Sequence, residues 1–297
     1  MRKKAVFNRV LAASAAFILI FTLTFAIAYS VEKKDLEESL KTAEEAPSDQ
    51  TAAPEGEAEA DPAGKPLTPA NQVNLTNKVF DQPQKPAPQN KVIYLTFDDG
   101  PGEFTETLLD VLKENNVKAT FFVTAGNEDK LDVLTREASE GHSIGVHSLT
   151  HKYNVIYSST DAFWEDFNAM QDIIREKTGS ETLLMRFPGG SSNTISSGVP
   201  GIMTTLTKQM KEKGYYYFDW NVDSDDAGSA RSAEEVSENC KRGVENTRVS
   251  VILCHDIKEY TVKGMKLFIP WALENGYTFL PLTTDDTSFN AHHTVRN

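Results

Sequence analysis

The sequence predicts an α/β protein, a distorted (β/α) barrel of about seven parallel strands, preceded by an N-terminal membrane helix and a disordered tether. One observation predicts the barrel, and a second predicts the membrane helix and tether that precede it. After residue 91, short apolar runs alternate with amphipathic stretches of helical period, as in βαβ units of a parallel sheet. Before residue 91, one long uncharged run is followed by a segment of low hydrophobicity. An open doubly wound sheet is the structural alternative to the barrel.

Bulk composition bounds the class of protein and its partners. Hydrophobic residues make up 39% of the 297-residue chain, so a sizeable core can form. With a formal net charge of −13 we expect no nucleic-acid partner, because phosphate binding needs a basic face. Two cysteines are too few for a disulfide scaffold. We expect Cys254 to be a buried small hydrophobe, and a disulfide between Cys240 and Cys254 is left open.

Residues 1–30 have the pattern of a signal anchor. Basic residues precede position 10, and residues 10–29 then contain no charge. This run is long enough to span a bilayer as a helix and is longer than the apolar part of the usual signal peptide. With the basic end in the cytoplasm, the protein would be single-pass and the rest of the chain extracytoplasmic. Residues 26–28 read A-I-A, and cleavage there would instead release a secreted protein.

Residues 31–90 are predicted to be a low-complexity linker. The segment is rich in Ala, Glu, Pro, Asp and Lys and poor in aromatic residues, so it cannot bury enough apolar surface to fold. Proline-rich spacers are also extended. We therefore expect a tether that holds a folded domain, residues 91–297, away from the membrane.

The folded domain contains seven apolar runs that are predicted to be β-strands. The predicted strands are Val92–Phe97, Ala119–Thr124, Ser143–His147, Leu183–Phe187, Tyr215–Val222, Val249–Cys254 and Tyr277–Leu282. The helical stretches between them are Glu106–Asn115, Lys130–Glu140, Ala162–Lys177, Ile202–Lys213, Ala233–Glu245 and Val262–Asn275. Several of these stretches end at a glycine, which is a common signal for the end of a helix.

Titratable side chains follow the predicted strands directly. They are Asp98 and Asp99 after the first strand, His147 and His151 at the third, Arg186 at the fourth, Asp223, Asp225 and Asp226 after the fifth, and His255 after the sixth. If every strand is parallel, these strand ends meet on one face, where α/β proteins place their chemistry. This convergence is the strongest functional signal in the sequence.

Part of this set has the composition of a metal site. His147 and His151 are four residues apart, so one helical turn would place both on one side. With a carboxylate from Asp98 or Asp99 they form a set of two histidines and one carboxylate, which leaves positions open for water and substrate. Zn²⁺ is the cofactor that we expect for a hydrolytic site of this kind, and other divalent ions such as Co²⁺ suit the same ligands.

The remaining polar residues suggest acid–base chemistry. Arg186 can pair with a carboxylate and keep it ionised, and the glycines after Pro188 let backbone N–H groups approach an oxyanion. His255 follows a strongly apolar run and, beside a metal, is a candidate general acid. Its other ring nitrogen then needs a partner, which Asp226 or Asp223 can supply.

Other polar residues are expected to have no catalytic role. His142 is predicted to be structural, and His292 and His293 lie in a polar C-terminal tail with no core nearby. Three acids of the predicted helix at 162–177 fit its solvated face, namely Glu165, Asp166 and Asp172. The three tryptophans are expected in the core or in a groove wall.

The motifs T-F-D-D-G-P, H-S-L-T-H, R-F-P-G-G, D-S-D-D and L-C-H together resemble those of the polysaccharide deacetylase family, also called the NodB-homology or carbohydrate esterase family 4 domain. Their order and spacing match, and the resemblance covers residues 91–282. It implies a distorted (β/α) barrel and metal-dependent removal of acetyl groups from N-acetylated sugars. By position, it makes Asp98 the catalytic base and Arg186 the residue that orients it. The metal ligands that it implies are Asp99, His147 and His151.

The resemblance implies further roles on the other side of the metal. His255 would be the acid with Asp226 orienting it, the backbone N–H of Gly189 would help to hold the oxyanion, and Leu253 would line the acetyl pocket. Two departures from the family are visible. The family often has an aromatic residue where Gly189 stands, and a tryptophan where Ala227 follows Asp226. We expect the chemistry to survive and the groove to be more open.

The hypothesis is therefore hydrolysis of N-acetyl groups from an extracellular polysaccharide. Peptidoglycan is the leading substrate, because a tethered enzyme outside a cell lies beside the wall; chitin-type or other acetylated glycans are alternatives. A catalytically inert glycan-binding module and a deacylase of small amides are the alternative functions. The intact set of acid, base and ligands argues against the first, and the tether against the second. We expect a monomer.

Overall fold

The computed structural model describes residues 91–285 and 292–297. The predicted membrane helix at 1–30 and the predicted linker at 31–90 lie outside these residues. Within the described parts of the chain, no helix is both long and apolar enough to cross a bilayer.

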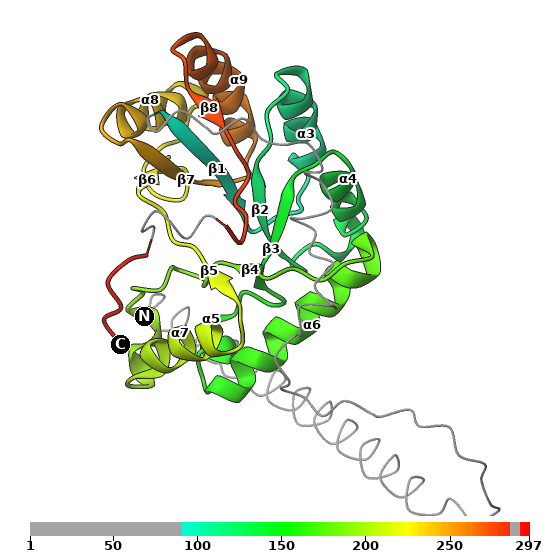
Figure 1. The fold of residues 1–297 in the computed structure, drawn as a ribbon, viewed down its shortest axis with the longest axis vertical. Helices are drawn as coiled ribbons and strands as arrows, with labels where there is room; N and C mark the ends of the chain where they lie inside the picture. The colour runs from blue at the N-terminus through cyan, green and yellow to red at the C-terminus, as the bar shows by residue number, and fades with distance from the viewer. Residues whose placement is uncertain (1–90, 286–291) are drawn as a thin grey trace, which may run out of the picture. The chain divides into compact units, whose positions relative to one another are not determined.

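Eight strands of the described chain form one sheet in which all pairings are parallel (Figure 1). The order is β5-β4-β3-β2-β1-β7-β6, and β8 pairs with β1 off this path. The strands are β1 (Val92–Asp98), β2 (Thr120–Thr124), β3 (Ser143–Ser148), β4 (Leu184–Met185), β5 (Tyr216–Tyr217), β6 (Val222–Asp223), β7 (Val249–His255) and β8 (Thr278–Phe279). The sheet is a curled half-barrel, consistent with the predicted distorted (β/α) barrel.

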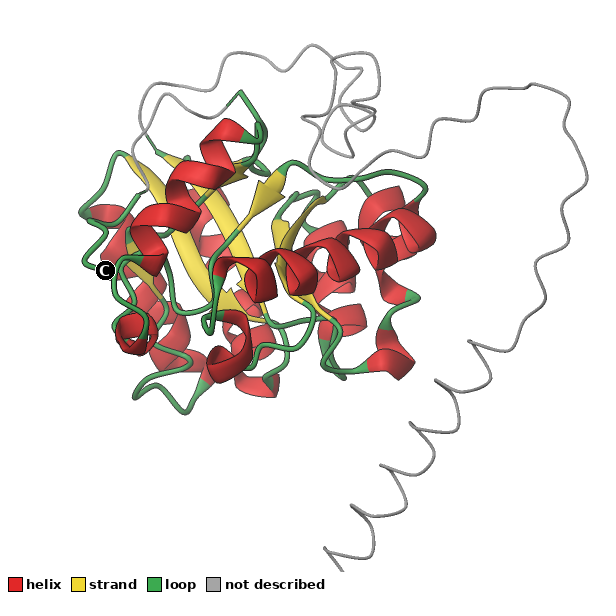
Figure 2. Ribbon diagram, turned by 90° about the horizontal axis from the view of Figure 1, so that it is seen from below, coloured by secondary structure: helices red, strands yellow, loops and turns green. Residues whose placement is uncertain are grey.

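Helices cover the outside of the sheet, as Figure 2 shows from below. They are α3 (Thr105–Glu114), α4 (Val133–Ser139), α5 (Tyr153–Ile156), α6 (Thr160–Thr178), α7 (Ile202–Glu212), α8 (Ala233–Glu245) and α9 (Glu259–Glu274), with short 3₁₀ turns η1 (Glu128–Lys130) and η2 (Ile195–Gly198). Each predicted helix is present, with ends that move by one turn at most. The one-turn helix α5 and both 3₁₀ turns were not predicted, because they are too short for a periodic signal.

The predicted fifth strand, Tyr215–Val222, is wrong as a single element. It divides into β5 and β6, which pair with β4 and β7 at opposite ends of the sheet. Between them, the backbone carbonyls of Phe218 and Asp219 accept hydrogen bonds from the buried Arg186 side chain instead of from a neighbouring strand. Accommodation of the guanidinium therefore interrupts the strand.

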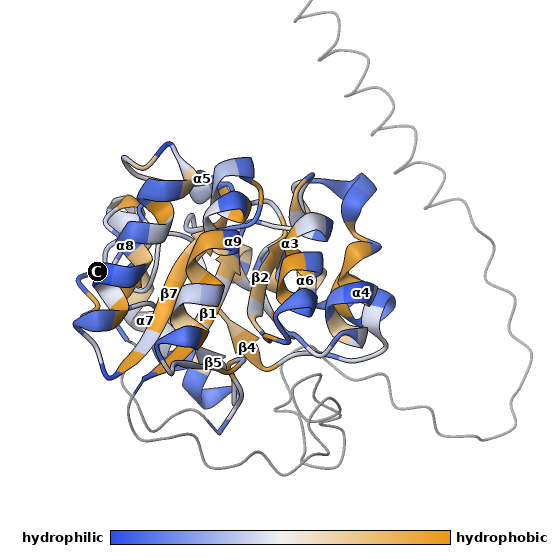
Figure 3. Cartoon of the chain, turned by 90° about the horizontal axis from the view of Figure 1, so that it is seen from above, coloured by the Kyte–Doolittle hydropathy of each residue, from blue (hydrophilic) through white to orange (hydrophobic). Residues whose placement is uncertain are grey.

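The strands separate two apolar clusters, and this separation positions the polar residues. Ile93, Leu95 and Phe97 of β1 pack in the large cluster between sheet and helices, whereas Val92 and Tyr94 face the small cluster inside the curl. Figure 3 shows the apolar character concentrated in β1, β7 and the helix faces next to them. Because side chains alternate along a strand, Thr96 and Asp98 continue the inner row. The inner face of the curled sheet is therefore apolar near the amino end of β1 and polar near its carboxyl end.

Gly145 in β3 supplies a test of how closely this sheet is packed. A Cβ built on Gly145 would lie 2.6 Å from Cδ1 of Phe122 and 3.0 Å from the carbonyl oxygen of Leu184. Gly145→Ala is expected to lower the free energy of unfolding by about 1–3 kcal/mol, the usual range for overpacking. Urea denaturation followed by circular dichroism measures this change. Gly198→Ala, where a Cβ meets nothing within 4 Å, is the control, and equal midpoints for the two variants would contradict the packing argument.

Candidate functional site

A buried ion pair joins Asp98 at the carboxyl end of β1 to Arg186, which directly follows β4. Nη1 of Arg186 donates to Oδ1 of Asp98 at 2.8 Å and to the hydroxyl of Thr96 at 2.6 Å. Nε donates to the Phe218 carbonyl at 2.9 Å and Nη2 to the Asp219 carbonyl at 3.0 Å. The exposed fractions of the two charged side chains are 0% and 4%. The pair fixes Oδ1 of Asp98, while Oδ2 lies 3.9 Å from the nearest histidine nitrogen of the site.

Three residues beside this ion pair place side-chain atoms that can bind a metal close to one another. One possible ligand atom from each of Asp99, His147 and His151 lies within 4.8 Å of the others. Oδ1 of Asp99 lies 3.5 Å from Nε2 of His147 and 3.3 Å from Nε2 of His151. Two ligands of a tetrahedral Zn²⁺, each bonded at about 2.0–2.1 Å, are about 3.3 Å apart. Oδ1 of Asp99 is also buried without a hydrogen-bond partner. The residues therefore fit a zinc ion.

The ring of His147 is held in the orientation that ligation requires. Its Nδ1 lies 2.7 Å from the carbonyl oxygen of Arg186, so Nδ1–H donates and the Nε2 lone pair faces the other ligands. Burial is the main cause that lowers the pKa of His147, and the lowered value favours the neutral imidazole. Metal ligation uses this neutral form.

The two histidines do not share a helical turn, so the reason given for their pairing was wrong. His147 belongs to β3, and His151 follows in a turn with a φ of +52°. Asp99 also has a positive φ, of +73°, and begins a turn where a Cβ on Gly100 would collide with the buried Asp256 carboxylate. Left-handed non-glycine residues cost about 1–3 kcal/mol each and persist where the surroundings fix them. Two of the three candidate ligands are therefore held by tertiary contacts in a strained backbone.

The turn that carries His151 is fixed by Asp166 from helix α6. The Asp166 carboxylate accepts from the Ser148 hydroxyl at 2.6 Å, from N–H of Leu149 at 2.7 Å, and from N–H and hydroxyl of Thr150 at 3.0 and 2.8 Å. With 7% of its surface exposed, Asp166 is not on the solvated face of its helix, which corrects the prediction. A signal was present in the sequence, because helical spacing places residue 166 on the same face as Phe163 and Met170.

A second dyad faces the metal set from the end of β7. Nδ1 of His255 lies 2.7 Å from Oδ1 of Asp226, and the His255 backbone N–H donates to Oδ2 at 2.7 Å. Of the two partners considered for His255, the structure brings Asp226 into contact, whereas the Asp223 carboxylate accepts from N–H of Asp225. Burial by itself lowers the pKa of His255, but the hydrogen bond and charge of Asp226, with Asp98 and Asp99 nearby, outweigh burial, so the pKa is raised.

Gly189 lies in the loop after β4, and Leu253 lies in β7. Gly189 follows Arg186 in a loop and has a φ of +74°, a conformation that favours glycine. Leu253 precedes His255 by two residues on β7 and pairs in register with Thr96 of β1. Because successive side chains of a strand alternate, Leu253 faces the same side of the sheet as His255. Their roles in acetyl binding stay predictions.

The C-terminal tail is packed on the domain, which corrects the expectation that no core lies near it. The ring of His292 stacks on that of Tyr217 with centroids 4.0 Å apart. The N–H of His293 donates to Oδ2 of Asp219 at 2.8 Å, and its Nε2 lies 2.8 Å from the Trp220 carbonyl. Oδ1 of the same Asp219 accepts from N–H of Ser191. The Trp220 carbonyl can accept from the tail because Trp220 lies between β5 and β6, outside the sheet.

Two further expectations, for His142 and Cys254, agree with the structure. His142 is buried, and its Nδ1 accepts from the backbone N–H of Ala119 at 3.1 Å, which is a structural role. Cys240 and Cys254 are both buried and free. The prediction that Cys254 is a buried small hydrophobe is therefore confirmed.

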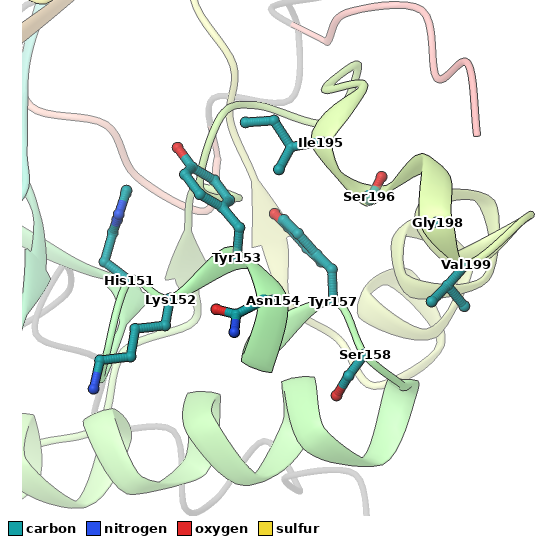
Figure 4. A pocket seen from close by; sticks show the side chains of 10 residues that line it. All are labelled: His151, Lys152, Tyr153, Asn154, Tyr157, Ser158, Ile195, Ser196, Gly198 and Val199. Carbon is teal, nitrogen blue, oxygen red and sulfur yellow. The ribbon is translucent and has the colours of Figure 1, made fainter. Parts of the chain in front are cut away.

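A surface pocket of about 610 Å³ adjoins the metal set between α5 and η2 (Figure 4). His151 is part of its lining, together with Tyr153, Tyr157 and the exposed side chain of Ile195. The pocket was not predicted, because both elements that form it were missed in the sequence.

Comparison with known proteins gives consistent matches over the described domain. The family profile described as polysaccharide deacetylase matches residues 85–217. A peptidoglycan-N-acetylglucosamine deacetylase of Bacillus cereus is 34% identical over 71% of this chain and 80% of its own length. The crystal structure of the catalytic domain of peptidoglycan N-acetylglucosamine deacetylase from Eubacterium rectale has 50% identity and a TM-score of 0.68, covering 70% of this chain and 94% of that one. A chitin deacetylase of Arthroderma benhamiae is 34% identical over 59% of this chain and 46% of its own length.

Asp166 supplies a test of the turn that carries His151. In Asp166→Asn, one carboxylate oxygen becomes an NH₂ group that cannot accept from the turn, so His151 loses its fixed position. We expect zinc affinity to fall by about 10- to 100-fold, as for other residues that orient metal ligands, in a competition titration against a chromophoric chelator.

Asp172→Asn in the same helix is the matched control, since 65% of that side chain is exposed and its partner is the surface residue Arg175. The control is expected to keep the zinc affinity of the unchanged protein. A melting temperature recorded for both variants separates loss of the turn from loss of the fold. An unchanged zinc affinity in Asp166→Asn would show that the turn does not depend on this carboxylate.

Proposed function

The chain belongs to the polysaccharide deacetylase family, and from that premise we propose that it removes N-acetyl groups from the amino sugars of peptidoglycan. Its family relatives make it a deacetylase, a hydrolase that acts on carbon–nitrogen bonds other than peptide bonds. The observation that carries the proposal is the placement of Asp98, fixed by a buried Arg186, beside the set of Asp99, His147 and His151. The peptidoglycan assignment is supported by the relatives from Bacillus cereus and Eubacterium rectale, which are named peptidoglycan N-acetylglucosamine deacetylases.

The site fits a divalent metal ion. Zn²⁺ is the proposed physiological metal, and Co²⁺ suits the same ligand atoms. When bound by Asp99, His147 and His151, it would polarise the acetamide carbonyl and make a water more acidic. The remaining chemistry belongs to the side chains and backbone of the protein.

Asp98 is the proposed general base. Its Oδ2 takes a proton from the attacking water, and the resulting hydroxide oxygen forms a bond to the acetamide carbon. The Arg186 guanidinium stabilises the ionised carboxylate and fixes its orientation through Oδ1. The developing oxyanion accepts a hydrogen bond from the backbone N–H of Gly189. Leu253 would face the acetyl methyl group.

His255 is the proposed general acid. Its Nδ1 is engaged by Asp226 at 2.7 Å, which leaves Nε2 to face the site. The raised pKa of His255 favours the protonated imidazole, which is the form that a general acid needs. Nε2–H protonates the sugar nitrogen as the C–N bond breaks. The products are acetate and a free amino sugar, so atoms and charge balance.

The N-terminal part of the chain completes the proposal. The uncharged run within residues 1–30 acts as a signal anchor, and residues 31–90 act as the linker to the deacetylase domain at 91–297. This arrangement places a monomeric domain outside the cytoplasm beside the wall. Cleavage after residue 28 would instead release it.

Acetate release tests the reaction and the substrate together. The full-length protein in mild detergent is expected to release acetate from fully N-acetylated peptidoglycan, to lose this activity with a chelator, and to recover it with Zn²⁺. Release from chitin oligomers and not from peptidoglycan would keep the reaction and overturn the substrate. No release from either glycan by zinc-loaded protein would favour the inert glycan-binding module.

Asp98→Asn separates turnover from binding. Removal of the base is expected to lower kcat by about 10²- to 10⁴-fold, the usual contribution of general base catalysis. Zinc content and glycan binding are expected to be retained in variant protein that is still folded, as its melting temperature shows. Asp223→Asn, a carboxylate at the end of β6 that Arg186 does not bind, is the control with unchanged kcat. An Asp98→Asn variant that still turns over at the normal rate would assign the base to another residue.

A further inference from the structure

Tyr153 lies between a candidate metal ligand and the glycine loop, and the sequence assigns it no role. It begins α5, and its ring meets that of His151 edge to face, with centroids 5.1 Å apart. A Cβ built on Gly189 would lie 3.6 Å from Cε1 and 3.7 Å from the hydroxyl oxygen of Tyr153. The absence of a side chain at Gly189 thus leaves the space beside the Tyr153 ring open. The tyrosine hydroxyl therefore lies next to the proposed oxyanion donor.

The direction of the side chain agrees with this placement. Figure 4 shows the rings of His151 and Tyr153 extending toward the same side of the pocket, whereas Lys152 and Ser158 extend to the opposite side. Tyr153 therefore extends to the side of the pocket toward which the candidate metal ligand His151 also extends.

The hydroxyl of Tyr153 is available as a donor, unlike that of its neighbour. The Tyr157 hydroxyl donates to the Pro188 carbonyl at 2.8 Å and is used within the fold. The Tyr153 hydroxyl makes no hydrogen bond to any residue in the described part of the chain. A tyrosine hydroxyl is a hydrogen-bond donor at neutral pH.

We propose that the Tyr153 hydroxyl is a second oxyanion donor, which hydrogen-bonds the acetamide oxygen together with the Gly189 N–H. The inference rests on the proposed function and adds a catalytic residue to it. Negative charge grows on that oxygen only as the tetrahedral intermediate forms. A donor at this point therefore stabilises the transition state more than the bound substrate, and its loss lowers kcat with little effect on KM.

Tyr153→Phe tests the inference, because it removes the hydroxyl and keeps the ring that packs on His151. We expect kcat on N-acetylated peptidoglycan to fall by about 10- to 100-fold, with KM, zinc affinity and melting temperature unchanged. Tyr277→Phe is the matched control, since that ring packs on Trp271 in the outer cluster. The control is expected to retain full activity.

Acetate binding compares Tyr153→Phe with the unchanged protein in a measurement that does not depend on catalytic turnover. Acetate is the product whose oxygen occupies the proposed oxyanion position, so calorimetry on the zinc-loaded protein should show weaker acetate binding by Tyr153→Phe than by the unchanged protein. Weaker binding supports the proposal even if the unchanged protein releases no acetate from any glycan, an outcome that would overturn the proposed function alone.

Three results would overturn the inference. Equal kcat and equal acetate affinity in Tyr153→Phe and the unchanged protein would leave the hydroxyl without a role. A raised KM with unchanged kcat would place the hydroxyl on a sugar group and not on the acetamide oxygen. A fall in zinc affinity that parallels kcat would make Tyr153 a structural support of His151.

Discussion

The buried pair of Arg186 and Asp98 is the constraint on which the rest of the site depends. A guanidinium without solvent access is stable only if its N–H groups find acceptors, and breaking such a pair costs about 3–5 kcal/mol. Arg186 meets this requirement with a carboxylate, the Thr96 hydroxyl and two backbone carbonyls. Those acceptors come from β1 and from the segment between β5 and β6. The pair therefore joins distant parts of the chain and orients a carboxylate at the same time.

The loops around this pair are anchored by two further buried carboxylates. Asp166 accepts from the turn that carries His151, and Asp219 accepts from the loop that follows Gly189. In each case a buried carboxylate accepts hydrogen bonds from backbone N–H groups of a loop, which have no neighbouring strand to bond to. His293 of the tail then donates to the same Asp219. The precise placement that hydrolysis needs is thus supplied by residues that do not contact the reacting atoms.

The polarity of the curled sheet explains why the chemistry sits at one end. The four side chains of β1 that face the inside of the curled sheet are apolar at Val92 and Tyr94 and polar at Thr96 and Asp98. Burial of the apolar half stabilises the domain, and the polar half carries the candidate site at the carboxyl ends of the parallel strands. His255 arrives opposite Asp98 because β7 pairs with β1 in register along its whole length.

The sequence by itself determined the elements and the candidate residues, because these depend on local patterns. Apolar runs and helical periods predicted the strands and helices, and the residues after the runs included Asp98, Asp99, His147, Arg186 and His255. Tertiary structure alone decided how these residues are held. His151 joins the metal set through a left-handed turn, Tyr215–Val222 divides around a guanidinium, and the tail binds Asp219 across 74 residues of chain. Contacts of this range leave no periodic trace in the sequence. Asp166 differs from them, because its helical spacing from Phe163 and Met170 already places it on the buried face of α6.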